Sequence, residues 1–110
     1  MRRLLVMLGL SLLLTAPALA ADTIKIGAFF DLSGRAAFIG TPTKLVAEMV
    51  VDKINAEGGV NGKQLELVVG DTEANPAKTV SLAKKFIHKD KVVANIGPTL
   101  NDNGMAVTRW

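Results

Sequence analysis

Cysteine is absent from the 110-residue sequence, and histidine occurs only once. The lack of cysteine excludes structural disulfides, thiol nucleophiles, thiolate metal sites and lipid attachment through a cysteine. The single histidine, His88, falls in a lysine-rich stretch of a predicted helix. Such a position favours a surface role over that of a base or a metal ligand. We therefore expect neither a metal nor a cofactor.

Three motifs typical of enzymes are also missing. No G-x-G-x-x-G follows the first predicted strand, and the sequence contains no G-x-x-x-x-G-K-[ST] loop and no G-x-S-x-G elbow. Asp31 and Asp71 each follow a predicted strand, but the capping of loops is the commoner role for such acids. We expect a protein that is not an enzyme. A small secreted enzyme with a Rossmann-like sheet is the alternative from another class.

The sequence has no apolar run long enough to span a bilayer. The apolar block Leu4–Leu14 falls well short of the roughly 20 residues that a membrane-spanning helix needs. Arg2 and Arg3 precede this block, and the small-residue triplet Ala18-Leu19-Ala20 follows it. This order is typical of a secretory signal peptide. We predict a signal peptide over residues 1–20 and cleavage after Ala20.

Charge of one sign is not in excess once this segment is removed. The thirteen Lys and Arg fall to eleven, against ten Asp and Glu, so the predicted mature chain carries a net charge of +1. This balance argues against nucleic acid and against an acidic membrane surface as partners. An exported chain without cysteine fits a soluble periplasmic protein.

The mature chain alternates between apolar runs and amphipathic segments. Strands are predicted over residues 24–30, 64–70 and 92–96, and helices over residues 41–57, from 75 to about 89, and from 101 or 102 onward. A strand–helix order repeated three times predicts an α/β fold, with a doubly wound parallel sheet and right-handed crossovers.

Cap residues and apolar spacing define the first two helices. Thr41 and Pro42 fit the cap and first position of the first helix, and Asn75-Pro76 repeats this signal at the second. Lys44 and Glu48 are spaced for an i,i+4 ion pair. The predicted buried faces consist of Leu45, Val46, Met49, Val50 and Ile54 in the first helix, and of Val80, Leu82, Ala83, Phe86 and Ile87 in the second.

Topology alone predicts where a ligand binds. With the common strand order 2-1-3, the carboxyl ends of the first and third strands are neighbours at a switch point, where open α/β sheets bind their ligands. This order places the loop at residues 31–40 beside the loop at residues 97–104. Asn101 or Asp102 is the predicted cap of the third helix. Residues 103–110 read as the start of a helix with no stop signal, so we expect the sequence to be a fragment.

Three stretches carry a resemblance to a known family: LSGRAAFIG at residues 32–40, INAEGGVNGKQLELVVGDTEANPAKTV at residues 54–80, and VVANIGPT at residues 92–99. The most specific part is INAEGGVNG, which leads into a strand and then a turn from Asp71 to Pro76. The mature chain resembles the amino-terminal part of the leucine/isoleucine/valine-binding type of periplasmic binding protein. These proteins are the substrate-binding subunits of branched-chain amino-acid ABC transporters.

The resemblance implies a two-lobed protein in which each lobe is a doubly wound α/β domain of the type I periplasmic binding class. Residues 21–110 would form the amino-terminal part of the first lobe, which is incomplete in this sequence. The protein would capture a small amino acid, amide or similar metabolite and deliver it to a permease in the inner membrane. A periplasmic ligand sensor of the same fold is the alternative within this family.

The resemblance also implies a ligand site. In relatives that bind amino acids, the loop after the third strand offers a hydroxyl and amides to the ligand carboxylate, commonly from a Ser where this chain has Asn101. The residue before Gly40 is commonly aromatic and is Ile39 in this chain. The implied ligand-binding residues are Phe38, Ile39, Thr99, Leu100, Asn101 and Asp102.

Overall fold

The computed structural model describes residues 22–109, and the predicted signal peptide at residues 1–20 lies outside the described residues. The strands β1 (Ile24–Phe30), β2 (Leu65–Asp71) and β3 (Ala94–Ile96) form a parallel sheet in the order β2-β1-β3. The helices are α1 (Ala37–Ala56), α2 (Pro76–Lys85) and α3 (Asn101–Val107), with a short 3-10 helix η1 (Gly34–Ala36) before α1 and a π-helix η2 (Phe86–Asp90) after α2. The predicted α/β class, doubly wound parallel sheet and strand order are confirmed.

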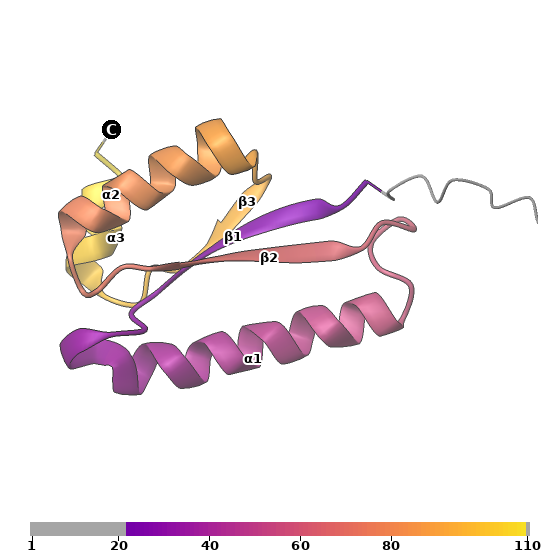
Figure 1. The fold of residues 1–110 in the computed structure, drawn as a ribbon, viewed down its shortest axis with the longest axis horizontal. Helices are drawn as coiled ribbons and strands as arrows, with labels where there is room; N and C mark the ends of the chain where they lie inside the picture. The colour runs from indigo at the N-terminus through magenta and orange to yellow at the C-terminus, as the bar shows by residue number, and fades with distance from the viewer. Residues whose placement is uncertain (1–21, 110) are drawn as a thin grey trace, which may run out of the picture.

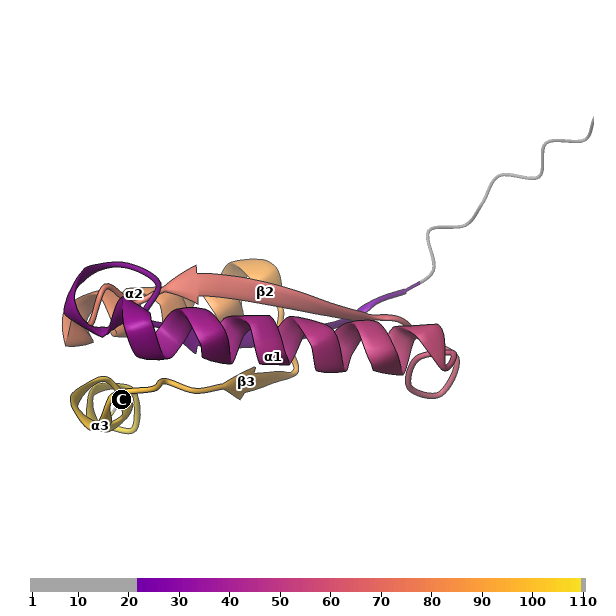
Figure 2. The ribbon, with the colours of Figure 1, turned by 90° about the horizontal axis from the view of Figure 1, so that it is seen from below.

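The helices lie on the two faces of the sheet (Figures 1 and 2). α1 covers one face, and α2 and α3 lie together on the other. This division follows from the strand order, because the crossover from β1 to β2 and the crossover from β2 to β3 run in opposite directions along the sheet. Right-handed crossovers in opposite directions place their helices on opposite faces.

The face covered by α2 and α3 holds the core of the described residues. Phe29 of β1 and Phe86 at the end of α2 are buried, with their ring centroids 4.9 Å apart, and Ala83 completes the cluster. Ile87 was predicted on this buried face, but its side chain is exposed. Phe86 keeps α-helical backbone angles, with φ −59° and ψ −43°, so Ile87 lies about 100° further round the helix than the buried Phe86.

On the face of the sheet where α1 lies, the described side chains do not pack closely. The prediction that the apolar stripe of α1 is buried is wrong for four of its five residues, since only Ile54 is half-buried and the others are exposed: Leu45, Val46, Met49 and Val50. A groove of about 500 Å³ runs between α1 and the three strands.

The predicted ion pair on the polar side of α1 is present, with Lys44 Nζ 2.8 Å from Glu48 Oε1. Among residues 22–109, no helix combines the length and the apolar character that crossing a membrane requires.

The start of α1 differs from the prediction. The helix begins at Ala37, so Pro42 lies inside it and cannot donate a backbone hydrogen bond to the carbonyl of Phe38. Close packing explains this start, because a Cβ added at Gly40 would lie 2.0 Å from the carbonyl oxygen of Asp31. The first turns of α1 therefore lie directly against the end of β1. In Figure 1 they are set at an angle to the rest of the helix.

The predicted cap is correct for α2 and wrong for α3. Asn75 caps α2 as predicted, since its Oδ1 accepts a hydrogen bond of 3.1 Å from the amide of Lys78. The cap of α3 is Leu100, whose side chain makes no capping bond, so the prediction of Asn101 or Asp102 is wrong. Both residues lie in the first turn of the helix instead. The third strand is also two residues shorter than predicted.

Candidate ligand-binding site

The loops at the carboxyl ends of β1 and β2 are joined through Asp71, the last residue of β2. Its carboxylate accepts hydrogen bonds from the amide of Leu32 at 2.9 Å, the hydroxyl of Ser33 at 2.7 Å and the amide of Glu73 at 2.9 Å. Partial burial raises the pKa of Asp71, but the bonds from Ser33, Glu73 and Leu32 outweigh it and lower the pKa below its ordinary value of 3.8. The role of Asp71 as a loop-capping acid is confirmed.

A buried polar cluster of Asp31, Thr72 and Asn103 connects three elements at the same end of the sheet. All three side chains are fully buried. Asp31 Oδ1 accepts hydrogen bonds from the hydroxyl of Thr72, from the amide of Ala74 at 2.9 Å and from Asn103 Nδ2 at 3.2 Å. Asn103 Nδ2 also lies 3.3 Å from Thr72 Oγ1. The cluster fixes α3 to the ends of β1 and β2, because buried polar groups are costly to separate from their partners.

The chain leaves β3 through Gly97, which has a φ of +89°. A Cβ at this position would lie 2.4 Å from the carbonyl oxygen of Phe29. A side chain here would meet both a strained backbone and the neighbouring strand. The glycine therefore lets the loop after β3 pass closely beside the end of β1.

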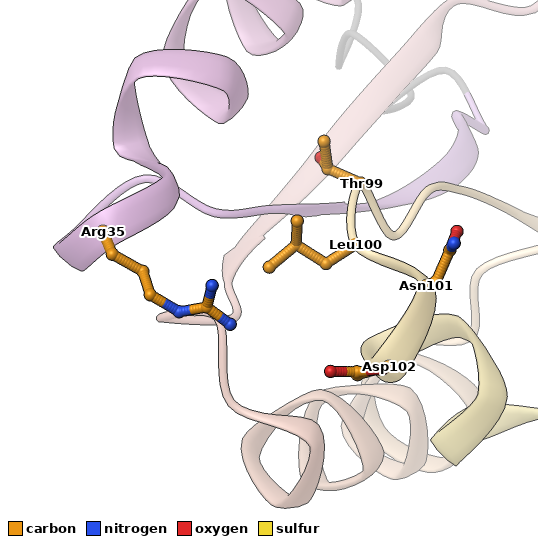
Figure 3. A pocket seen from close by; sticks show the side chains of 5 residues that line it. All are labelled: Arg35, Thr99, Leu100, Asn101 and Asp102. Carbon is orange, nitrogen blue, oxygen red and sulfur yellow. The ribbon is translucent and has the colours of Figure 1, made fainter.

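This loop forms one wall of a pocket of about 330 Å³ (Figure 3). The pocket is lined by Arg35 of η1 on one side and by Thr99, Leu100, Asn101 and Asp102 on the other. These residues come from the segments that follow β1 and β3, which are neighbouring strands. The pocket is thus at the carboxyl ends of the strands, at the switch point of the sheet.

Charged groups of opposite sign face this pocket. In Figure 3, the guanidinium of Arg35 and the carboxylate of Asp102 extend toward one another, with Leu100 beside the space between them. Neither side chain has a hydrogen-bond or ion-pair partner within residues 22–109, so their charged atoms are more than 4.0 Å apart. The side chain of Asn101 extends away from Arg35. The pocket therefore offers a cation and an anion to a ligand.

The structure brings together four of the six residues predicted for the site, namely Thr99, Leu100, Asn101 and Asp102. Phe38 and Ile39 lie in the first turn of α1 outside the lining, with 77% and 38% of their surface exposed. Their part in binding stays a prediction. Sequence reasoning did not single out Arg35. One signal was available, since Arg35 is the only charged residue between Asp31 and Lys44.

The groove under α1 is larger than this pocket but less suited to a small ligand. Its walls are almost entirely apolar and include Ile26, Val46, Val50 and Ile96. Sites for small polar molecules combine apolar walls with a few placed polar groups that fix the orientation of the ligand. Of the two, only the pocket between Arg35 and Asp102 provides such groups.

No set of three or more His, Cys, Asp or Glu side chains in the described part of the chain is grouped as metal ligands would be. His88 lies on η2 with an exposed side chain, as its sequence context predicted. The carboxylates at the strand ends accept hydrogen bonds from loop amides, as described above for Asp31 and Asp71.

Comparison with known proteins gives the family. A family model described as periplasmic binding protein matches residues 23–110. The chain belongs to the periplasmic binding protein family, as the resemblance predicted. It is 39% identical over 71 residues to a leucine-, isoleucine-, valine-, threonine- and alanine-binding protein of Pseudomonas aeruginosa, covering 64% of this chain and 19% of that protein. It is 30% identical to Leu/Ile/Val-binding protein homolog 7 of Brucella suis, covering 99% of this chain and 27% of that protein.

Solved structures agree with this assignment. The branched-chain amino acid transporter substrate-binding protein LivJ of Streptococcus pneumoniae, in complex with isoleucine, superposes with a TM-score of 0.76. It is 38% identical, and the match covers 78% of this chain and 25% of that one. A type 1 periplasmic binding protein of Bordetella pertussis gives a TM-score of 0.71 at 33% identity, with 78% and 23% coverage. The chain spans about a fifth to a quarter of the length of these relatives.

Proposed function

We propose that the protein is the substrate-binding subunit of an ABC transporter. It captures a small amino acid or a related metabolite in the periplasm and delivers it to a permease in the inner membrane. The observation that carries this proposal is the pocket between the ends of β1 and β3, where a sheet of this topology binds its ligands. Its volume of about 330 Å³ suits a molecule of amino-acid size. Membership of a family of binding proteins further supports it.

We further propose that the described residues are part of a larger, two-lobed protein. Residues 1–20 act as a cleaved signal peptide, and residues 21–110 form the amino-terminal part of the first of two lobes. The ligand is then enclosed between the lobes, with Thr99 to Asp102 on the first-lobe side. The apolar stripe left open on α1 supports this arrangement, because exposed apolar patches of this kind mark surfaces that another part of a protein covers.

Isothermal titration calorimetry tests the binding function. The full-length gene product is titrated with leucine, isoleucine, valine, threonine and alanine, and then with small amides, urea and aromatic acids. We expect saturable binding of at least one of these compounds at one site. A protein that binds none of them contradicts the proposed function.

Three variants test the place of binding. Asn101→Ala changes the lining of the pocket, and Ile39→Asp changes the first turn of α1, which the family resemblance implies at the ligand. The control is Lys85→Ala, at the carboxyl end of α2, where Lys85 pairs with Asp90 of η2. We expect Ile39→Asp to reduce affinity more than Asn101→Ala, because it adds a charge to the wall that we propose for the bound ligand. We expect Lys85→Ala to leave affinity unchanged. Equal affinities for all the proteins would place the binding site elsewhere.

Uptake measurements test the transport role. A strain that lacks the gene should lose uptake of the radiolabelled ligand, and expression of the gene should restore it. Unchanged uptake together with an altered transcriptional response to the ligand would instead support a sensor.

A further inference from the structure

Two Asn-Gly pairs occur in the sequence, and the structure places them in opposite surroundings. Asn61-Gly62 lies in the connection from α1 to β2, within the INAEGGVNG stretch, whose residues do not line the pocket. Asn103-Gly104 lies in α3. Asparagine is among the thermolabile residues of proteins. A glycine after it has no Cβ, so its backbone nitrogen can approach the asparagine side chain. The surroundings of each pair therefore decide whether it reacts.

Asn61 and Gly62 are both exposed. They have left-handed backbone angles, with φ +50° and +76°, as a two-residue hairpin turn requires. Nothing lies within 4 Å of a Cβ built on Gly62. The side chain of Asn61 and the amide of Gly62 make no hydrogen bond within residues 22–109. Both reacting groups are thus accessible and unpaired in this part of the chain.

Two backbone hydrogen bonds hold the turn closed. The amide of Val60 donates to the carbonyl oxygen of Lys63 at 2.8 Å, and the amide of Lys63 donates to the carbonyl oxygen of Val60 at 3.0 Å. Surface turns with so few contacts open locally at a much lower free energy than unfolding of the whole protein requires. Asn61 can therefore reach the geometry of ring closure without loss of the fold.

Asn103 has the opposite surroundings. Its side chain is fully buried, and its Nδ2 donates a hydrogen bond to Asp31 Oδ1 at 3.2 Å. The amide of Gly104, which would be the nucleophile, donates to the carbonyl oxygen of Leu100 at 3.0 Å. Reaction at this pair would require α3 to unfold and leave the strand ends. The same dipeptide is therefore protected here.

We propose that Asn61 is a site of spontaneous deamidation and isoaspartate formation, from which the fold protects Asn103. The nitrogen of Gly62 loses its proton to base in the solvent and attacks Cγ of Asn61. The N–Cγ bond forms, the Cγ–Nδ2 bond breaks, and Nδ2 leaves as ammonia. Water then opens the cyclic imide. Cleavage at Cγ gives aspartate, and cleavage at the backbone carbonyl carbon of Asn61 gives isoaspartate. Each event consumes one water, releases one ammonia, adds one negative charge and involves no redox change.

The two products should affect the turn differently. Aspartate tolerates left-handed backbone angles as asparagine does, so the pairing of Val60 with Lys63 persists. Isoaspartate adds one atom to the main chain within the turn and so disrupts this pairing. In Figure 1 the connection from α1 to β2 lies at the opposite end of the sheet from α3. We expect unchanged ligand affinity, and the inference does not depend on the proposed function.

Peptide mass spectrometry of the full-length gene product tests the proposal. The folded protein is incubated at mildly alkaline pH in heavy-oxygen water and then digested in ordinary water, so that heavy oxygen marks only reaction before digestion. Trypsin separates the two pairs into peptides 54–63 and 92–109. We expect heavy oxygen to enter at Asn61 roughly tenfold or more faster than at Asn103, and isoaspartyl methyltransferase to label peptide 54–63. In urea, which removes the fold, the two rates should become comparable.

Three results would overturn the proposal. One is equal rates at the two pairs in the folded protein. Another is an Asn61 that stays unchanged while a synthetic peptide of residues 54–63 reacts. The third is a difference in rate that persists in urea, because local sequence rather than the fold would then protect Asn103.

The matched variant is Asn61→Gly, which removes the reactive amide and keeps a residue pair suited to the same turn. We expect its peptide 54–63 to take up no methyl label. The side chain of Asn55, the other asparagine of this peptide, is held by hydrogen bonds with the backbone of Leu65 at 2.9 and 2.7 Å. Label that persists in the variant would place the modification at Asn55 and overturn the assignment.

Discussion

The two faces of the sheet carry amphipathic helices that differ in what surrounds them. On the face of α2 and α3, Phe29, Ala83 and Phe86 are buried and in contact. On the face of α1, Met49 has 70% of its surface exposed and Leu45 has 53%. The difference teaches that an amphipathic pattern determines which side of a helix is apolar, whereas burial of that side needs partners from other elements. α2 packs closely against α3, whereas α1 contacts chiefly β1, β2 and η1 among the described residues.

The largest expected effect concerns the open face itself. Residues 21–110 expressed alone should be aggregated or molten, because the exposed stripe on α1 leaves too little buried surface to offset the conformational entropy of the chain. The measurements are binding of the dye ANS, near-ultraviolet circular dichroism and thermal unfolding. A monomer with a sharp cooperative transition and no dye binding would contradict this expectation.

Removal of the Phe86 ring should destabilise the packed face of the sheet, which α2 and α3 cover. In the full-length gene product, Phe86→Ala should lower the free energy of unfolding by about 3–5 kcal/mol, because it empties a fully buried site beside Phe29. Chemical denaturation measures the change. A loss below about 1 kcal/mol would mean that this cluster is not the core of the protein.

A matched substitution on α1 tests the comparison between the two faces of the sheet. Met49→Ala in the full-length product should cost about 2 kcal/mol, since the proposed lobe covers the stripe that is exposed in the described residues. The same denaturation experiment gives the value. A cost near zero would show that α1 stays open in the full-length protein and would contradict the proposed lobe.

The buried polar cluster that joins α3 to the strand ends should contribute less to the free energy of unfolding than Phe86 does. Asn103→Leu should cost about 1–3 kcal/mol, because it removes the Nδ2 donor shared by Asp31 and Thr72. Asn103→Asp should cost more at neutral pH, because it places a second carboxylate beside Asp31. The repulsion raises the pKa of the introduced carboxyl in the folded state, so its cost should shrink as the pH falls. Equal, pH-independent costs for the two variants would contradict this account of the cluster.

The smallest effect is expected from Asp71. Its pKa is lowered in the folded state, so its contribution to stability is fully present above the ordinary value of 3.8 and is lost as the pH falls through the lowered value. Asp71→Asn should remove this part of the acid dependence and leave the rest. The measurement is the free energy of unfolding of both proteins between neutral pH and pH 3. Identical acid dependence would mean that the contacts with Leu32 and Ser33 do not contribute to stability.

Local signals in the sequence identified the arrangement of elements with little error. The bounds of β1, the cap of α2 at Asn75 and the pair of Lys44 with Glu48 all depend on contacts within a few residues or on a continuous apolar run. The repeated strand–helix order predicted the parallel sheet, and the common strand order 2-1-3 that was assumed for it is the order observed. The same order placed the loops after β1 and β3 side by side and so located the pocket.

Errors arose where contacts between distant residues outweigh local signals. The proline at position 42 marked a helix start, but the packing of Gly40 on Asp31 begins α1 five residues earlier. Asn101 and Asp102 each had the chemistry of a cap, yet the buried contact of Asn103 with Asp31, 72 residues away in sequence, fixes where α3 sits. Ile87 follows the buried Phe86 on the next position of the helix, on a side that stays exposed in the described residues.

The sequence by itself determined the fold class, the family and the end of the sheet where the pocket lies, because these depend on periodicity, turn residues and element order. Only the tertiary structure decided which side chains share that pocket. Arg35 and Asp102 are 67 positions apart in the sequence and line the same pocket because β1 and β3 are neighbours and Gly97 allows their loops to approach. Sequence periodicity carries no record of such distances, since they arise from the packing of whole elements against one another.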